Sequence, residues 1–227
     1  MVLSKRLLAV VKMVPKIKTV ADIGCDHGKA AVWLVRNGVA DYAICTDISA
    51  KSLNKARGLV EAHGLKSRII LREGDGFKAL SRGEAAAAVI AGMGGDLIKN
   101  MLDAGGDSVP DVIILSCNKK AQVLRQWLCE SGFEIQDEEL VPENGKFYPV
   151  ISARRGAAYS LTKAELEFGP VLLKKKPDAL KQYVLRRLET AKLLRGELEN
   201  KSTARSARAK DDISENINMY IEVIKCL

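Results

Sequence analysis

Two acidic side chains alternate with glycines in the segment Asp22-Ile-Gly-Cys-Asp-His-Gly28, which follows a short apolar run and opens a helix-forming stretch. Gly24 and Gly28 permit tight turns and let a ligand approach the backbone where a Cβ would otherwise stand. Asp47 closes the next apolar run, where a carboxylate can accept hydrogen bonds from both ribose hydroxyls. These residues predict a site for an adenosine-containing cofactor. The alternative is a simple turn between a strand and a helix.

The spacing of the glycines favours one adenosine cofactor over another. Dinucleotide folds use G-x-G-x-x-G, in which bare backbone and a helix N-terminus hold a pyrophosphate. Here Asp22 and Asp26 interrupt the glycines, and two carboxylates would repel a pyrophosphate. They would attract the sulfonium and ammonium groups of S-adenosylmethionine. We therefore expect S-adenosylmethionine, with an NAD-binding dehydrogenase as the weaker alternative.

Two more predicted strands end in loops that could touch a ligand. Glu73-Gly-Asp-Gly76 places an acid where it could receive an adenine amine, although such turns are also common loop punctuation. Ala91-Gly-Met-Gly-Gly95 suggests close approach of a ligand or of backbone, with a plain flexible connection as the alternative. Because open α/β sheets bind ligands at this edge, we expect the cofactor to contact one set of residues. They are Gly24, Cys25, Gly28, Asp47, Ile48, Asp75, Gly76 and Gly92.

His27 is one of only two histidines, and it stands inside the first glycine loop beside Asp26. No His or Cys partner lies at a metal-ligand spacing, so we expect no metal. We interpret Asp26 and His27 as the catalytic candidates, polar groups that face the cofactor or the acceptor. His63, before Gly64 at a helix end, fits a structural role.

Apolar β-rich runs alternate with helical patterns as far as residue 131. The predicted strands are Thr19–Ile23, Tyr42–Thr46, Arg68–Leu71, Ala86–Ala91 and Val112–Leu115, with helices that include Ala50–His63 and Lys119–Ser131. Two further runs, Phe133–Leu140 and Phe147–Ala153, flank an Asn-Gly step that favours a tight hairpin. We predict an α/β fold: a class I Rossmann-like methyltransferase sheet, parallel with a terminal antiparallel hairpin.

The pattern becomes entirely helical after Gly156. Apolar residues recur at helical spacing at Leu180, Val184, Leu188, Ala191, Leu194 and Leu198, and again at Ile213, Ile217, Tyr220 and Ile224 after a polar break over Asn200–Asp212. This predicts a coiled-coil-like helical hairpin, for which dimerisation is the alternative function. We divide the chain into a cofactor-binding domain, residues 1–156, and a helical domain, residues 157–227.

The 227-residue chain carries a formal net charge of +8. Through Arg155 there are 22 basic and 18 acidic residues, and after it 14 and 10, so each part carries +4 although the second is half as long. This density suggests a nucleic-acid-binding arm, with a solvated basic helix as the alternative. Five scattered cysteines, no signal peptide and no apolar run of membrane-spanning length indicate a cytoplasmic protein without disulfides or membrane contact.

Several motifs together resemble the bacterial TrmK family of tRNA adenine-22 N1-methyltransferases. They are Leu3-Ser-Lys-Arg-Leu7, Ala21-Asp-Ile-Gly-Cys-Asp-His27, Ala91-Gly-Met-Gly-Gly95, Glu143-Asn-Gly-Lys146 and Phe168-Gly-Pro170. The resemblance implies S-adenosylmethionine as cofactor and tRNA as partner through the helical domain. With the cofactor at the first three strand ends, we expect the acceptor beside the next loop, at Met93, Gly94, Gly95 and Asn118. Arg6 is a further acceptor candidate, with a solvated face of an N-terminal helix as its alternative. One departure is Lys119, where the family pattern has a second Asn; it bears on the acceptor pocket and not on the fold.

The implied acceptor suggests a mechanism. Adenine N1 carries an in-plane lone pair that can attack the sulfonium methyl once the base is exposed, and the product is cationic. Asp26 or a nearby carbonyl would accept the adenine amine, while His27 orients the pocket. We expect a monomer. The alternatives are a small-molecule or protein methyltransferase with a dimerising arm, and a non-catalytic S-adenosylmethionine-binding regulator of nucleic acid.

Overall fold

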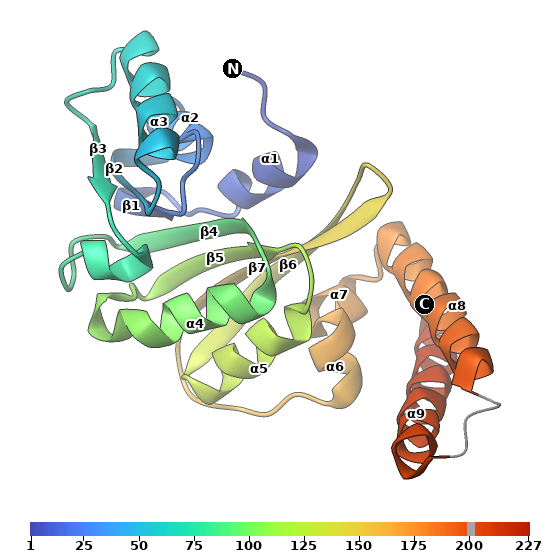
Figure 1. Ribbon diagram of the computed structural model, residues 1–227. Helices are drawn as coiled ribbons and strands as arrows, with labels where there is room; N and C mark the ends of the chain where they lie inside the picture. Colours follow the sequence, from blue (N-terminus) through green and yellow to red (C-terminus); the bar gives the residue numbers. More distant parts are fainter. Residues whose placement is uncertain (199–202) are drawn as a thin grey trace. The chain divides into compact units, whose positions relative to one another are not determined.

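The computed structural model describes residues 1–198 and 203–227, and the chain divides into two compact units, Met1–Ser160 and Leu161–Leu227 (Figure 1). The boundary predicted from the sequence lies slightly earlier, after residue 156.

The first unit is built on one seven-stranded sheet with the order β3-β2-β1-β4-β5-β7-β6. Its strands are β1 (Ile17–Ile23), β2 (Ala40–Asp47), β3 (Ile69–Glu73), β4 (Ala87–Met93), β5 (Val112–Cys117), β6 (Phe133–Glu143) and β7 (Lys146–Arg155). The first five are parallel, and β7 is antiparallel to both β5 and β6. Strand order reverses between β1 and β4, which is where open α/β sheets form a ligand crevice.

Helices cover both faces of this sheet (Figure 1). They are α1 (Lys5–Lys12), α2 (Lys29–Arg36), α3 (Ala50–Ala62), α4 (Gly95–Gly105) and α5 (Ala121–Glu130), with 3₁₀ turns η1 (Gly76–Ala79) and η2 (Gly106–Ser108). Helices α1, α2 and α3 pack in one apolar cluster, to which they contribute Val10, Val32 and Leu53, respectively. Ile98 and Leu124 carry α4 and α5 into the other. Successive residues of each strand point to opposite faces of the sheet, so the strands contribute side chains to both clusters. The predicted sheet, parallel with a terminal antiparallel hairpin, is confirmed.

The terminal hairpin turns at Asn144 and Gly145, whose φ angles are 51° and 71°. Two consecutive left-handed residues make the type of turn that matches the twist of paired strands. The register Glu143↔Lys146 closes directly around this pair. The Asn-Gly step therefore forms the antiparallel hairpin that the sequence predicts.

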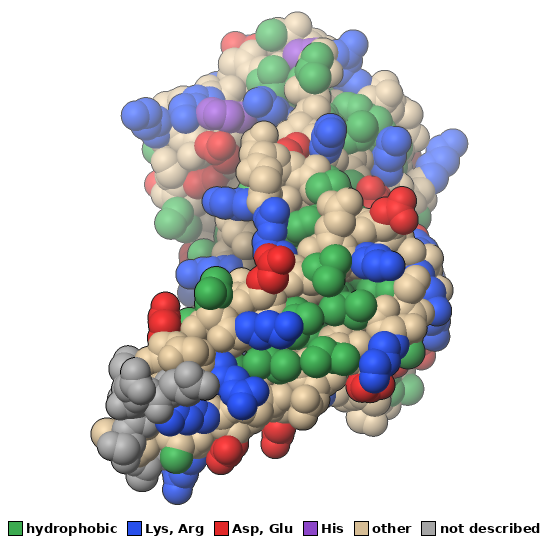
Figure 2. All heavy atoms as spheres, turned by 90° about the vertical axis from the view of Figure 1, so that its right-hand side faces the viewer, with side chains coloured by type: hydrophobic (Ala, Val, Ile, Leu, Met, Phe, Trp, Pro, Cys, Tyr) green, Lys and Arg blue, Asp and Glu red, His purple; other side chains and the backbone are tan. Residues whose placement is uncertain are grey.

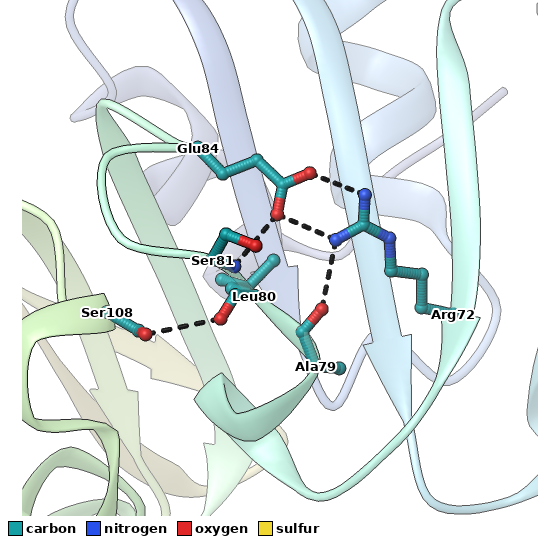
Figure 3. A network of polar contacts seen from close by, with 6 residues as sticks. All are labelled: Arg72, Ala79, Leu80, Ser81, Glu84 and Ser108. Atoms are coloured by element: carbon teal, nitrogen blue, oxygen red, sulfur yellow. Dashed lines mark hydrogen bonds and ion pairs between the residues drawn. The ribbon is translucent and has the colours of Figure 1, made fainter.

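An ion-pair network holds the segment that follows β3 (Figure 3). Arg72 on β3 donates from Nη1 to Glu84 Oε2 (2.7 Å) and to the Ala79 carbonyl (3.0 Å). The Ser81 N–H also donates to Glu84 Oε2 (3.0 Å), and Ser108 Oγ donates to the Leu80 carbonyl (3.2 Å). The network fixes η1 and the loop after it to the end of the sheet.

The described part of the second unit contains helices and no strands. Its helices are α6 (Lys163–Phe168), α7 (Pro170–Lys175), α8 (Asp178–Leu198) and α9 (Ala204–Cys226). Leu180, Val184, Leu188 and Ala191 of α8 are buried, as are Ile217, Tyr220 and Val223 of α9. Leu194, which the periodicity places in the buried stripe, is 46% exposed.

The predicted polar break over 200–212 is wrong from residue 204 onward, and residues 200–202 lie outside the described part. α9 begins at Ala204, and its N-cap Thr203 accepts a hydrogen bond from the Ser206 N–H (3.1 Å). Ala, Arg and Lys are good helix formers even where no apolar stripe marks a buried face. Among the described residues, no helix is long and apolar enough to cross a membrane.

Candidate functional site

A cavity of about 490 Å³ lies at the carboxyl ends of β1 and β4. The lining comes from α1 and the residue before it, from the end of β1 and the segment that leads into α2, and from the end of β4. Its lining comprises Ser4, Arg6, Leu7, Asp22, Gly24, Cys25, Asp26, His27, Lys29, Ala30, Ala91, Gly92 and Met93. Seven of the predicted site residues are thus brought together at the reversal of strand order: Arg6, Gly24, Cys25, Asp26, His27, Gly92 and Met93.

Asp22 is the buried charge of this cavity. Asp22 is the penultimate residue of β1 and is only 5% exposed, and its Oδ2 accepts a hydrogen bond from the Ala31 N–H (3.3 Å). Burial raises the pKa of this carboxyl to about 7, opposed by the Ala31 hydrogen bond and reinforced by the negative charge of Asp47. A cation placed in the cavity would stabilise the ionised form.

Asp26 and His27 lie at the open side of the cavity. The Asp26 backbone is left-handed, with φ of 46°, and its N–H donates to Asp47 Oδ2 (3.1 Å). Its carboxylate lies 3.6 Å from His27 Nε2 and also accepts from Ser52 Oγ (3.5 Å). The two side chains are 63% and 38% exposed, respectively. The strained loop therefore presents a carboxylate and an imidazole to a ligand entering from solvent.

The predicted adenosine contacts lie along the same edge of the sheet but outside the lining of this cavity. Asp47 pairs in register with Glu73, which places the β2 and β3 ends side by side. Both Asp47 oxygens accept backbone N–H groups, from Asp26 and Ser49. Each oxygen keeps a free lone pair for a ribose hydroxyl. Ile48, which follows, is 73% exposed and offers an apolar surface for a base.

Asp75 and Gly76 lie at the β3 end. Asp75 accepts a hydrogen bond from Lys78 Nζ (2.7 Å) on the following turn, and both side chains are 61% exposed. Gly76 has φ of 60°, and a Cβ there would lie 3.2 Å from Met101 Cε. Turn geometry accounts for this glycine, and Asp75 keeps its second oxygen available.

The glycines differ in what they permit. Gly24 (φ 66°) faces the cavity, where a Cβ would collide with Met93 Cε. Gly28 (φ 66°) instead packs on α3, where a Cβ would lie 3.1 Å from Ala56 Cβ. A Cβ on Gly95 would come within 2.3 Å of the Lys120 carbonyl oxygen, so this glycine admits backbone rather than ligand. Sequence spacing alone does not distinguish these cases.

Arg6 joins α1 to the acceptor side of the cavity. Its Nη1 donates to Asn118 Oδ1 (2.7 Å), and Asn118 Nδ2 donates to the Gly92 carbonyl (2.6 Å). The guanidinium also lies 4.8 Å from the centre of the Tyr148 ring, and the Arg6 N–H donates to Glu143 Oε1. Two predicted acceptor residues, Arg6 and Asn118, are therefore connected to Gly92, which the sequence predicts as a cofactor contact.

Lys119 occupies the place where the family pattern has a second Asn. Its backbone carbonyl accepts from the Gly95 N–H (2.9 Å), and its side chain lies 3.4 Å from a Cβ built on Gly94, the N-cap of α4. An aliphatic stem over Gly94 places the lysine beside the loop, with its ammonium exposed. The adjacent Lys120 pairs with Asp96 (2.7 Å).

Sequence reasoning missed several members of the site. Ser4, Leu7, Lys29, Ala30 and Ala91 line the cavity, and Tyr148 packs on Arg6. The one available signal is proximity to the quoted motifs, since Ser4 and Leu7 flank Arg6. Within the residues that the structure describes, no three His, Cys, Asp or Glu side chains gather as a metal site.

A parallel sheet finished by an antiparallel hairpin, with an acid-lined cavity at its reversal point, defines a class I Rossmann-like methyltransferase domain. The sequence model of the TrmK family, tRNA (adenine(22)-N(1))-methyltransferase, matches residues 20–221. The chain belongs to this family, and the resemblance inferred from its motifs is confirmed.

Individual relatives are similar to this protein over 98% of the chain. The tRNA (adenine(22)-N(1))-methyltransferase of Bacillus subtilis is 35% identical over 98% of this chain and 97% of its own. The crystal structure of the B. subtilis m1A22 tRNA methyltransferase TrmK superposes with a TM-score of 0.92, covering 98% of this chain and 99% of that one at 32% identity. A Streptococcus pneumoniae protein in complex with S-adenosyl-L-methionine gives 0.88, at 29% identity over 98% of this chain and 100% of its own.

Proposed function

We propose that this protein transfers the methyl group of S-adenosylmethionine to N1 of an adenine in tRNA, at position 22. The observation that carries the proposal is the buried Asp22 carboxyl beside Gly24 at the point where strand order reverses. Family membership supplies the acceptor. A site with these acids suits a cationic ligand, and the cytoplasm, where tRNA is found, is the expected location.

The residues present fit S-adenosylmethionine. Asp22 would hold the ammonium group, Gly24 and Cys25 admit a ligand close to the backbone, and Asp47 has lone pairs for the ribose hydroxyls. Ile48 and Asp75 would receive the adenine, with Gly28 and Gly76 shaping the two turns. When bound, the cofactor supplies a methyl group on a positively charged sulfur. The protein contributes orientation and charge.

The acceptor base would enter beside Gly92, Met93, Gly94 and Gly95. Asn118 fixes the Gly92 carbonyl, and Arg6 fixes Asn118, so the loop presents a preset hydrogen-bonding edge. Asp26 would accept the adenine amine or stabilise the cationic product, while His27, 3.6 Å away, orients that carboxylate. Adenine N1 needs no base to remove a proton, since its lone pair is the nucleophile.

Substitution of Asp26 tests this assignment. Asp26→Ala should leave S-adenosylmethionine affinity within about threefold and lower turnover on tRNA about a hundredfold, because the carboxylate acts on the acceptor. Asp41→Ala is the matched control, because Asp41 is an exposed aspartate at the amino end of β2 and lies outside the cavity lining. Calorimetry measures the affinity, and mass mapping of the methylated nucleotide measures turnover. Wild-type protein that binds both ligands but adds no methyl group would instead be a non-catalytic regulator.

The helical unit is the proposed tRNA arm, and we expect it to act within a monomer. Lys181, Lys192 and Arg195 are exposed along α8 and make no ion pair with the described residues. Figure 2 shows Lys and Arg side chains interspersed with apolar ones on the face of the molecule that it presents. Unpaired basic side chains are what phosphate contacts require. Light scattering would test the monomer.

A further inference from the structure

The Met93 side chain occupies the space directly over Gly24. A Cβ built on Gly24 would lie 2.0 Å from Met93 Cε and 3.7 Å from its sulfur. Both residues line the cavity at the β1 and β4 ends. Any ligand that uses the bare backbone of Gly24 must therefore displace the Met93 methyl group, because two groups cannot share that volume.

A β-bulge directs Met93 into the cavity. The β4–β5 register shifts between Ala91 and Met93, and the intervening Gly92 has φ of 91°. An extra residue of this kind re-aims the side chain that follows it. Without the bulge, the alternation of β4 would not place this methionine against the loop after β1.

Hydrogen bonds from Asn118 hold the backbone on both sides of the Met93 side chain. Asn118 holds both flanking carbonyls: its Nδ2 donates to Gly92 O (2.6 Å) and its N–H donates to Met93 O (2.7 Å). Methionine has three rotatable side-chain bonds and an adaptable thioether. Movement is therefore confined to the Met93 side chain, and Arg6, anchored to Asn118, does not share it.

We propose that Met93 is a gate between the cofactor cavity and the acceptor loop, an inference that rests on the proposed function. In one position, the one in this structure, its methyl group lies against Gly24. It swings toward the Gly94 side when the amino-acid end of S-adenosylmethionine lies against Gly24. In that position the thioether is a wall against which the target base is placed, which makes Met93 a positioning residue that couples cofactor binding to acceptor binding.

Methyl-labelled methionine reports the movement directly. In full-length protein with ¹³C-methyl methionine, addition of S-adenosylhomocysteine should shift the Met93 signal, assigned by its loss in Met93→Leu. Met13 and Met219 lie outside the cavity lining and should not move. A Met93 signal that stays fixed while calorimetry records binding would overturn the gate.

Affinity and turnover should change in opposite directions. Met93→Ala should bind S-adenosylhomocysteine about three- to tenfold more tightly, because a closed conformation no longer competes with the ligand. At saturating cofactor it should turn over tRNA about tenfold more slowly, because the wall is lost. Met13→Ala, the same change at a half-buried site outside the cavity, should alter neither. Unchanged affinity and turnover in Met93→Ala would contradict the proposal.

A double-mutant cycle of unfolding free energies tests the contact between Gly24 and Met93 without any ligand. Gly24→Ala should cost more stability in the wild-type background than in Met93→Ala, where the colliding methyl is absent. Equal costs would show that the two residues do not compete for space. The proposed function fails separately, when wild-type protein leaves tRNA unmethylated although the Met93 signal responds to S-adenosylhomocysteine.

Discussion

Asp22 combines burial with a position in the ligand cavity, and this combination makes its ionisation depend on what the cavity holds. Its pKa is raised to about 7, chiefly because the carboxylate is removed from water. A cationic ligand would restore the ionised form. Asp26, His27, Arg6 and Lys29 also line the cavity, so a variant of Asp22 itself is needed to assign any pH effect.

Cofactor affinity should weaken as pH falls through about 7, since the ligand then competes with a proton for Asp22. We expect a loss of about tenfold between about pH 8 and about pH 6, measured by calorimetry. Asp22→Asn should bind weakly at both values, with little pH dependence. A wild-type affinity that is flat over this range would contradict the role of Asp22.

The free energy of unfolding should depend on pH in the direction opposite to cofactor affinity. A raised carboxyl pKa means that the folded state binds the extra proton, so stability falls as pH rises from about 4 to about 7. Above that range the buried charge costs stability in full. Asp22→Asn should therefore be about 1 to 3 kcal/mol more stable than wild type at pH 8 and equal to it near pH 4. Urea unfolding at the two pH values measures the difference.

The spacing of residues in the sequence identifies the loops that face the ligand cavity. It does not identify which residues of those loops face the cavity. Gly24 and Gly28 are equivalent in the motif, yet one opens on the cavity and the other packs on Ala56. Gly95 similarly accommodates the carbonyl of Lys120, a residue of the loop between β5 and α5. These contacts depend on tertiary neighbours, which no local pattern contains.

At the scale of elements, the loop after β3 depends on Arg72 and Glu84. The Arg72 guanidinium lowers the pKa of the Glu84 carboxyl to about 2, aided by the Ser81 N–H. The two side chains are 31% and 27% exposed, so solvent screening reduces the stabilisation. A lowered carboxyl pKa contributes stability that is complete above the unfolded value, about 4.5, and is lost as pH falls toward 2.

Arg72→Met should lower the free energy of unfolding by about 1 to 2 kcal/mol at neutral pH, since it leaves a half-buried carboxylate with one N–H partner. The deficit should shrink below about pH 4 as Glu84 becomes protonated. Lys78→Met in the same segment is the control, because the exposed Lys78–Asp75 pair should contribute almost nothing. Equal effects of both variants would show that Glu84 draws no special stability from Arg72.

The strands were accessible to sequence reasoning because buried parallel strands are short apolar runs and because Asn144-Gly145 marks the hairpin. The start of α9 could not be predicted in this way, because its first turns have no apolar stripe and depend on the Thr203 cap. Exposed helix with good intrinsic propensity resembles a polar linker when only periodicity is considered.

For the whole molecule, charge is the property that separates the two units. The part after Arg155 carries +4 on 14 basic and 10 acidic residues, in about half the length of the part before it. Many of its charges are already paired, as Arg187 is with Glu167 and Lys225 with Glu222. Lys181, Lys192 and Arg195 of α8, which make no ion pair with the described residues, are therefore the cations available to a polyanion.

Two lysines of the helical unit allow a matched test of that interpretation. Lys192 is exposed and makes no ion pair with the described residues, whereas Lys225 pairs with Glu222 (2.7 Å). Lys192→Glu should weaken tRNA binding and reduce the slope of log affinity against log salt by about one, because one phosphate contact and its released counterion are lost. Lys225→Glu changes net charge identically but should leave the slope unchanged. Filter binding over a salt series measures both, with S-adenosylmethionine affinity as the check on folding. If the two variants weaken binding equally, the effect is one of overall charge, and α8 does not contact the RNA.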